Sequence, residues 1–198
     1  TNAPYVLPKH RGGARIGHDR IIDTMMMDGL EDAYTPGKPM GAFAEDTVRA
    51  YGFTREEQDA YAIRSLERAN AAIASGGFAK EIVPVAVPGR NGVVLIDTDE
   101  QPSKARPEKI PELKPVFARD GTITAANASS ISDGAAALVM TRRSFAERLG
   151  FPVVARVVAT SAHAHEPSLF TTAPVPAMQK ELGLAGWTAA DVDLFEVN

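Results

Sequence analysis

The chain has 198 residues, of which 44% are hydrophobic and 23% are charged, enough for one or two domains with a buried core. Its 21 basic and 25 acidic residues give a formal net charge of -4, which argues against a nucleic-acid partner or a membrane-binding face. No apolar run is long enough to span a bilayer, and residues 1–11 lack a signal-peptide pattern. We therefore expect a cytoplasmic protein.

The chain contains no cysteine. Disulfides, thiolate metal sites and a cysteine nucleophile are therefore excluded within these residues. The chain begins at Thr1 without an initiator Met and stops at Asn198, directly after the apolar run at 192–197. Because domains usually end in polar, exposed segments, we expect these residues to belong to a longer protein.

The first part of the chain predicts a loop followed by helices. Residues 1–17 are rich in Gly and Pro and predict the loop. Asp19 is placed to cap a helix over residues 19–28. A second helix is expected over residues 42–51, because Gly52 follows as a stop residue.

The third predicted helix has the clearest signals. Thr54 and Glu57 have the spacing of a capping box, in which a hydroxyl and a carboxylate satisfy free amide groups reciprocally. Gly76 and Gly77 are expected to end the helix. Its apolar positions recur on one face, namely Ala62, Leu66, Ala69 and Ile73.

Beyond this helix, the sequence predicts a hairpin and then an α/β layer. The hairpin pairs 82–87 with 93–97 around Asn91-Gly92, and residues 98–116 are expected to form a connecting segment. The later elements are strands at 122–126, 153–159 and 192–197, a buried apolar run at 135–140, helices at 141–149 and 174–183, and a capped turn at 188–191. This alternation predicts an α/β layer, preceded by a separate, inserted unit that ends before residue 117.

The segment at 124–134 consists mostly of small residues, because seven of its eleven positions are Ala, Ser or Gly. Small side chains let a ligand or another backbone approach closely, with amides and hydroxyls free to bond it. Tight packing between sheet layers would explain the same composition. From the residues alone, both interpretations stay open.

Three polar residues are further candidates. His163 and His165 would share one face of a strand, but zinc requires three or four ligands, so we expect surface or hydrogen-bonded histidines and no metal centre. Asn198 follows a predicted strand, where its amide could hold a water or donate to a developing oxyanion. It could equally be a turn residue.

Six blocks of the chain resemble the thiolase family, in the order in which that family carries them. The longest is T-I-T-A-A-N-A-S-S-I-S-D-G-A-A-A-L-V-M at 122–140. The others are P-M-G-A-F-A-E-D-T at 39–47, R-E-E-Q-D-A-Y-A-I-R-S at 55–65, G-F-A-K-E-I-V-P-V at 77–85, L-K-P-V-F at 113–117 and D-L-F-E-V-N at 193–198. The similarity covers nearly the whole chain, and six ordered blocks are far more specific than any single one.

The resemblance implies an α/β fold, the α-β-α-β-α layered sandwich of thiolases with a loop domain inserted in its first half. Residues 1–120 would be this loop domain, which binds coenzyme A and makes oligomer contacts. Residues 121–150 would end the N-terminal half, and residues 151–198 would start the C-terminal half. The nucleophilic Cys would lie before Thr1, and the catalytic His and a second Cys after Asn198.

The resemblance also implies the site residues. Asn198 would be catalytic, because it would hold the water that forms an oxyanion hole together with the His. Ser129 and the backbone near Ala128 would bond the pantetheine arm of coenzyme A, and Phe170 would shape the acyl pocket. The groove for pantetheine and adenine would be lined by Leu30, Met40, Phe117, Ala125 and Ile131.

The implied activity is that of an acetyl-CoA acetyltransferase or 3-ketoacyl-CoA thiolase of fatty acid metabolism. It would cleave or form a β-ketoacyl-CoA such as acetoacetyl-CoA by a ping-pong mechanism, with coenzyme A and acetyl-CoA as substrates and no covalently bound cofactor. The expected partners are acyl-CoA substrates and further copies in a homodimer or homotetramer, with no nucleic acid and no membrane. Because the chain has no cysteine, we expect it to be inactive by itself, and two alternatives stay open: a non-catalytic module that binds coenzyme A, and a structural oligomerisation piece.

Overall fold

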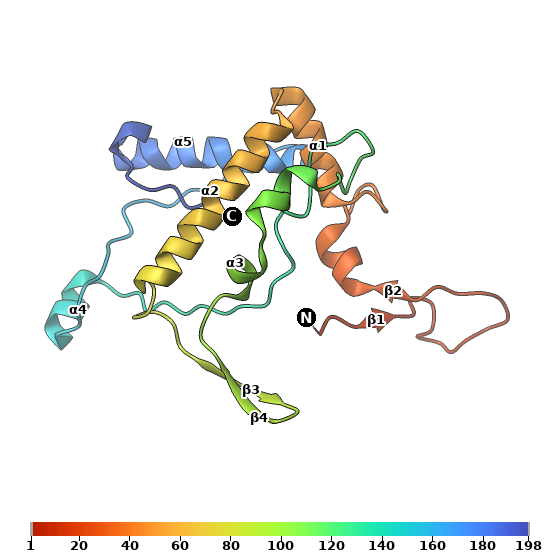
Figure 1. Ribbon diagram of the computed structural model, residues 1–198, viewed down its shortest axis with the longest axis horizontal. Helices are drawn as coiled ribbons and strands as arrows, with labels where there is room; N and C mark the ends of the chain where they lie inside the picture. The colour runs from red at the N-terminus through yellow and green to blue at the C-terminus, as the bar shows by residue number, and fades with distance from the viewer. Residues whose placement is uncertain (1, 198) are drawn as a thin grey trace. The chain divides into compact units, whose positions relative to one another are not determined.

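The computed structural model describes residues 2–197 and divides into two compact units. One unit combines residues 1–29 with 131–198, and the other is Leu30–Ser130. Figure 1 shows the helices and strands of both units in chain order. Within the described residues, no helix combines the length and the apolar character that crossing a bilayer requires.

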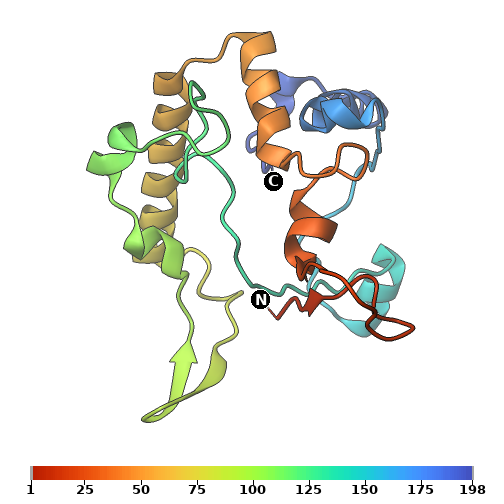
Figure 2. The same cartoon turned by 90° about the vertical axis from the view of Figure 1, so that its right-hand side faces the viewer.

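Two consecutive helices frame the unit at 30–130. Helix α1 is Met40–Tyr51 and helix α2 is Arg55–Ser75, and a short turn joins them (Figure 2). Gly52 ends α1 in the left-handed conformation, with φ at 70°, which glycine adopts without steric cost. Both predicted helices are confirmed.

The capping box of α2 is present as predicted. The amide of Glu57 donates to Thr54 Oγ1 at 3.1 Å, and the amide of Thr54 donates to Glu57 Oε2 at 2.8 Å. Two amide groups that the helix itself leaves without partners are thereby satisfied. Local sequence therefore determines where α2 begins.

Replacing Thr54 with Ala is expected to lower the free energy of unfolding by about 1 kcal/mol, because the Glu57 amide loses its acceptor. The midpoint of urea unfolding, followed by circular dichroism, measures this change. Thr98→Ala is the matched control, since the exposed Thr98 hydroxyl donates to the carboxylate of the neighbouring Asp97. Equal shifts in both variants would contradict the capping role.

The predicted hairpin forms, but its first strand begins three residues later than expected. Strands β3, Val85–Gly89, and β4, Gly92–Ile96, pair antiparallel, with Gly89 opposite Gly92. The two residues between the strands are Arg90 and Asn91, so Asn91-Gly92 is not itself the turn, and Gly92 begins β4 with φ at 117°. In both views the hairpin extends away from α2 (Figures 1 and 2).

The segment at 98–116 contains more structure than the connecting segment predicted for it. It forms helix α3, Glu100–Lys104, and a 3-10 helix η2, Pro107–Glu112. The carboxylate of Asp99 caps α3 by accepting from the Gln101 amide at 3.2 Å. The prolines and charges that suggested a surface linker instead begin and cap two short helices.

The strand predicted at 122–126 is wrong. These residues form an irregular loop, in which Ile123 and Thr124 are buried. A strand needs a neighbouring strand to bond its amides, whereas here the side chains of Glu45 and Asn127 accept from the amides of residues 122–124. Side chains therefore replace the expected sheet partner.

At the start of the chain, the helix predicted over 19–28 is only partly correct. Strand β1, Tyr5–Val6, pairs antiparallel with strand β2, Ile22–Asp23. Helical structure begins after β2 and continues into a π-helical turn, η1, at Met26–Leu30. The cap is Asp23 rather than Asp19, since its carboxylate accepts from the Met25 amide at 2.9 Å.

The helices predicted in the last third are confirmed. They are α4, Arg143–Leu149, and α5, Pro174–Ala185, with two 3-10 helices, η3 at Pro167–Thr172 and η4 at Ala189–Asp191. Helix α5 continues two residues beyond the expected end near Gly183. At η4 the capping box predicted at 188–191 is present, and the backbone amide of Thr188 lowers the pKa of the Asp191 carboxyl by donating to it.

The strands predicted at 153–159 and 192–197 do not form within the described residues. The run at 135–140, expected to be buried, is exposed, with Leu138 at 87% and Val139 at 94% of full accessibility. Apolar patterning indicates which side chains can be buried, but a strand also needs a partner for its amides. None of these three runs pairs with another segment of the described chain.

Candidate functional site

A cavity of about 680 Å³ lies within the unit at 30–130. Helix α2 forms one wall, residues from 99 to 110 form a second, and the small-residue loop at 125–130 forms a third. Its lining consists of Phe53, Glu57, Gln58, Tyr61, Ala62, Ser65, Leu66, Ala69, Asp99, Gln101, Pro102, Ala105, Ile110, Ala125, Ala126, Asn127, Ala128, Ser129 and Ser130.

The chemistry of this lining favours a slender and neutral ligand segment. Alanines and serines from both α2 and the loop leave space between the walls because their side chains are small. Hydroxyl and amide groups are interspersed among them. The charged lining residues are Glu57 and Asp99, both carboxylates engaged at helix N-termini. No lining residue is a cation, so the walls offer no counter-charge to a phosphate.

A buried carboxylate holds the loop that forms the third wall. Glu45 of α1 is 2% exposed, and its Oε1 accepts from the amides of Thr122 at 3.0 Å and Ile123 at 2.9 Å. A Cβ at Gly121 would collide with this carboxylate, so the position requires glycine for space. Glu45 thus takes the place that a partner strand would have had.

Asn127 closes the same loop on itself. Its Oδ1 accepts from the Thr124 amide at 2.7 Å, and its Nδ2 donates to the Thr122 carbonyl at 3.1 Å. Nδ2 also approaches Asp59 Oδ1 of α2 at 3.4 Å. The fully buried Thr124 accepts from the Ala126 amide through its hydroxyl at 3.2 Å. The backbone at 124–128 is therefore held in one conformation at the edge of the cavity.

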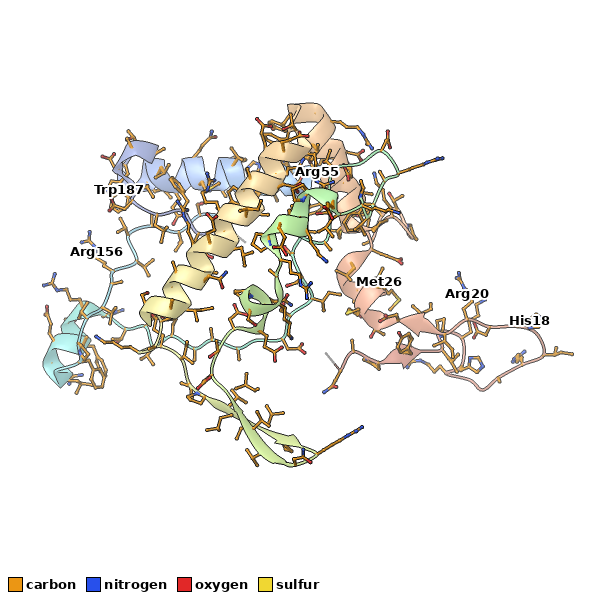
Figure 3. The ribbon with its side chains drawn as sticks, in the orientation of Figure 1. His18, Arg20, Met26, Arg55, Arg156 and Trp187 are labelled. Atoms are coloured by element: carbon orange, nitrogen blue, oxygen red, sulfur yellow. The ribbon has the colours of Figure 1, made fainter. Side chains whose placement is uncertain are left out.

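Arg55 ties the first and second walls together from the first turn of α2 (Figure 3). Its Nε bonds Asp59 Oδ2 at 2.7 Å, and Nη2 donates to the carbonyls of Ile110 at 3.0 Å and Leu113 at 2.9 Å. From the same helix, Gln58 Nε2 donates to Thr122 Oγ1 at 2.9 Å. Three of the sequence blocks, at 39–47, 55–65 and 122–140, therefore converge in one hydrogen-bonded network beside the cavity.

The structure brings three of the predicted site residues together at this cavity. Ala125, Ala128 and Ser129 all line it. The amide of Ala128 is not free for a ligand, because it donates to the Thr124 carbonyl at 3.0 Å. The backbone at Ala128 thus has only its carbonyl to offer a ligand, whereas the Ser129 hydroxyl is on an exposed residue.

Three other predicted site residues gather at the start of α1, away from the cavity lining. Leu30 and Met40 flank an isolated antiparallel bridge. The Phe117 ring packs directly on Gly41, where an added Cβ would collide with it. The family pattern Met-Gly at 40–41 therefore has a steric reason, since only glycine leaves room for this ring.

Two more predicted site residues lie in the unit that combines the start of the chain with the residues after 130. Ile131 is exposed in a segment without regular structure, and Phe170 lies in η3. Asn198 lies outside the described residues. The roles implied for all these residues stay predictions.

Sequence reasoning missed the contribution of α2 to the cavity. Ala62, Leu66 and Ala69 were recognised as one helical face, but such a face is usually interpreted as core packing. A usable signal was the small size of two of these residues, beside the polar Gln58 on the same helix. Small and polar residues on one face are more typical of a ligand wall than of a close-packed core.

The fold and the cavity define an α/β protein that offers a neutral, small-residue site to a slender ligand. Comparison with known proteins gives the family. The model of the thiolase N-terminal domain matches residues 1–144, and that of the thiolase C-terminal domain matches residues 151–198. The chain belongs to the thiolase family and has a thiolase-type α/β fold.

Individual relatives agree with this assignment. The chain is 45% identical to an acetyl-CoA acetyltransferase of Pseudomonas aeruginosa over 99% of its own length and 50% of the relative's. The acetyl-CoA acetyltransferase of Bacillus anthracis superimposes with a TM-score of 0.89 at 40% identity, covering 96% of this chain and 48% of that one. The Acat5 thiolase of Ascaris suum, solved in complex with coenzyme A, gives 0.87 at 40% identity, covering 98% of this chain and 49% of that one. The chain thus spans about half the length of these relatives.

Proposed function

We propose that this chain supplies the surface on which a thiolase-type acyltransferase binds coenzyme A. The observation that carries the proposal is the cavity whose third wall is the loop at 125–130, within the block that resembles the thiolase family. The names of the relatives, acetyl-CoA acetyltransferases, and the coenzyme A complex of the Ascaris suum thiolase support it. The complete protein would act on β-ketoacyl-CoA substrates such as acetoacetyl-CoA.

The chemistry of the cavity suits the pantetheine arm of coenzyme A. This arm is long, slender and neutral, with two amide groups that need hydrogen-bond partners. Ser129 and the carbonyl of Ala128 can supply such partners, while Ala125, Ala62 and Ala69 leave room for the chain of the ligand. The nucleotide phosphates would stay outside, because Glu57 and Asp99 would repel them.

The reaction proposed for the complete protein is reversible thiolysis. A cysteine thiolate attacks the keto carbon of β-ketoacyl-CoA, the bond between the α and β carbons breaks, and acetyl-CoA leaves as an enolate that takes up a proton. A second coenzyme A thiolate then removes the acyl group from the cysteine. Asn198 would hold the water of an oxyanion hole that stabilises developing negative charge. The cysteine must come from outside residues 1–198, which contain none.

Other parts of the proposal concern residues outside the cavity. Leu30, Met40, Phe117 and Ile131 would line the groove along coenzyme A, and Phe170 would border the acyl group. We further propose that residues 1–120 act as the inserted loop domain, followed by the end of the N-terminal half at 121–150 and the start of the C-terminal half at 151–198. The complete protein would be a cytoplasmic homodimer or homotetramer of fatty acid metabolism.

Filling the cavity tests the proposed binding site. Ala62→Phe in the complete gene product is expected to raise the KM for coenzyme A about tenfold, because the ring occupies space that the pantetheine arm needs. Initial rates of acetoacetyl-CoA thiolysis at varied coenzyme A measure this. Ala71→Phe is the matched control, since Ala71 is an exposed residue of the same helix that does not line the cavity. An unchanged KM in Ala62→Phe would show that coenzyme A does not bind in this cavity.

The absence of cysteine from these residues favours a second candidate, a module that binds coenzyme A without transferring acyl groups. The two functions differ in the complete gene product. Thiolysis of acetoacetyl-CoA that iodoacetamide abolishes would support the acyltransferase. Calorimetric binding of coenzyme A without any thiolysis would support the binding module, and no binding would contradict both.

A further inference from the structure

The turn that carries Phe170 is held by two side chains that converge on one carbonyl. Leu169, inside η3, has φ -107° and ψ 18°, which is not helical and lies in the sparsely populated bridge region. Its carbonyl oxygen is 2.7 Å from His165 Nε2 and accepts from Thr172 Oγ1 at 2.9 Å. Both bonds therefore act on the residue directly before Phe170.

The carbonyl acceptor determines where the proton of His165 lies. A carbonyl oxygen can only accept, so Nε2 must carry a proton to approach it at 2.7 Å. Thr172 Oγ1 is 3.4 Å from the same nitrogen, but the shorter bond of this hydroxyl goes to the Leu169 carbonyl. The imidazole therefore carries a proton on Nε2.

The segment before the turn is fixed at both ends. Ser161 Oγ donates to the Ala177 carbonyl of α5 at 2.6 Å, and His165 binds η3. Between them, the rings of His163 and His165 meet edge to face, with centroids 5.0 Å apart and planes at 86°. This arrangement orients the His165 ring towards Leu169.

We propose that His165 is a positioning residue that holds Phe170 in one orientation and thereby determines which acyl groups the site accepts. The inference rests on the proposed function, in which Phe170 borders the acyl group. The bond from Nε2 holds the Leu169 carbonyl, so the backbone that leads into Phe170 is held with it. When the bond is lost, the Leu169 carbonyl keeps only its bond from Thr172 Oγ1, so the backbone before Phe170 is held less firmly and acyl chains of different length are accepted more equally.

Three variants of the complete protein separate the hydrogen bond from the ring. His165→Phe keeps a ring against His163 but has no donor. His165→Gln has an N–H donor of similar reach but no ring. His163→Phe is the matched control, because it preserves the ring pair and His163 makes no hydrogen bond among the described residues.

The readout is the ratio of kcat/KM for acetoacetyl-CoA to kcat/KM for 3-ketohexanoyl-CoA. His165→Phe is expected to move this ratio about three- to tenfold towards one, which corresponds to the loss of one hydrogen bond. His165→Gln should stay within about twofold of the natural protein, and His163→Phe should leave the ratio unchanged. An unchanged ratio in His165→Phe, or an equal change in the Gln and Phe variants, would overturn the proposal.

A second measurement does not depend on catalysis. Nitrogen-15 spectra of the histidine rings, with the His165 signals assigned by their loss in His165→Gln, are expected to show a protonated Nε2 at neutral pH. An Nδ1–H tautomer would overturn the inference even in an active enzyme. If the complete protein shows the expected Nε2–H signal but cleaves no β-ketoacyl-CoA, the proposed function fails while the hydrogen bond stands.

Discussion

Replacing Glu45 with Ala is expected to lower the free energy of unfolding of the unit at 30–130 by about 2–4 kcal/mol. The Glu45 carboxylate is 2% exposed and accepts from the amides of Thr122 and Ile123. Its removal leaves two amide donors without a partner, in a place where Ile123 is itself buried. Hydrogen exchange of residues 120–128, measured by mass spectrometry, reports the loss as faster exchange in this loop.

Two further variants make the Glu45 prediction specific. Glu45→Gln should cost about 1 kcal/mol, because its amide oxygen can accept the same two bonds but without the negative charge. Asp46→Ala, at the adjacent position, should cost at most about 0.5 kcal/mol. Asp46 is 53% exposed, and its ion pairs with Lys38 and Arg49 lie at the surface. An equal loss at positions 45 and 46 would mean that the buried carboxylate does not hold the loop.

Replacing Asn127 with Asp is expected to destabilise the same loop by about 2–3 kcal/mol and to raise the KM for coenzyme A about tenfold or more. The Nδ2 donor to the Thr122 carbonyl is lost, and a carboxylate oxygen takes its place, close to the buried Asp59. The carboxylates at positions 127 and 59 would repel each other strongly, because water has little access to the buried Asp59 and screens the repulsion poorly. The loop at 124–128 must then move, and Ser129 moves with it at the edge of the cavity.

The Asn127→Asp prediction can be checked by its pH dependence. Protonation of the new carboxyl restores a donor and removes the repulsion, so the variant should approach the natural protein in stability as the pH becomes acidic. Asn70→Asp, on an exposed position of α2, is the control and should leave stability and KM nearly unchanged. A destabilisation by Asn127→Asp that does not depend on pH would argue against contact with Asp59.

These two variants connect the sequence blocks to the proposed activity. Glu45, Asp59 and Asn127 do not all line the cavity, yet together they determine the path of the loop that does. A ligand site made of small residues has few side chains of its own to define its shape. Its precision therefore depends on the buried polar groups beneath it.

Much of the helical structure could be predicted because its signals are local. The capping box at Thr54 and the stop at Gly52 each act within a few residues of their own position. The hairpin is similar, since the short turn between Gly89 and Gly92 determines its register. The family could also be recognised, because the six blocks are identified by their residues and their order along the chain, without knowledge of the fold.

The strands and the cavity could not be predicted in the same way, because they depend on contacts between residues far apart in the chain. Residues 122–126 have the composition of a strand, but Glu45 from α1 bonds their amides, and nothing in the block itself identifies that partner. The runs at 153–159 and 192–197 have apolar patterns without a pairing segment in the described chain.

The sequence by itself thus determined helices α1, α2, α4 and α5, the capping boxes at Thr54 and Thr188, the presence of the hairpin and the family. The tertiary structure decided which amides are bonded by side chains rather than strands, and that α2 and the loop at 125–130 face each other across a cavity. The physical reason is the distance along the chain between the residues that interact. Capping and turn formation involve residues three or four positions apart, whereas the bonds from Glu45 to Ile123 and from Arg55 to Ile110 join residues far apart in the chain.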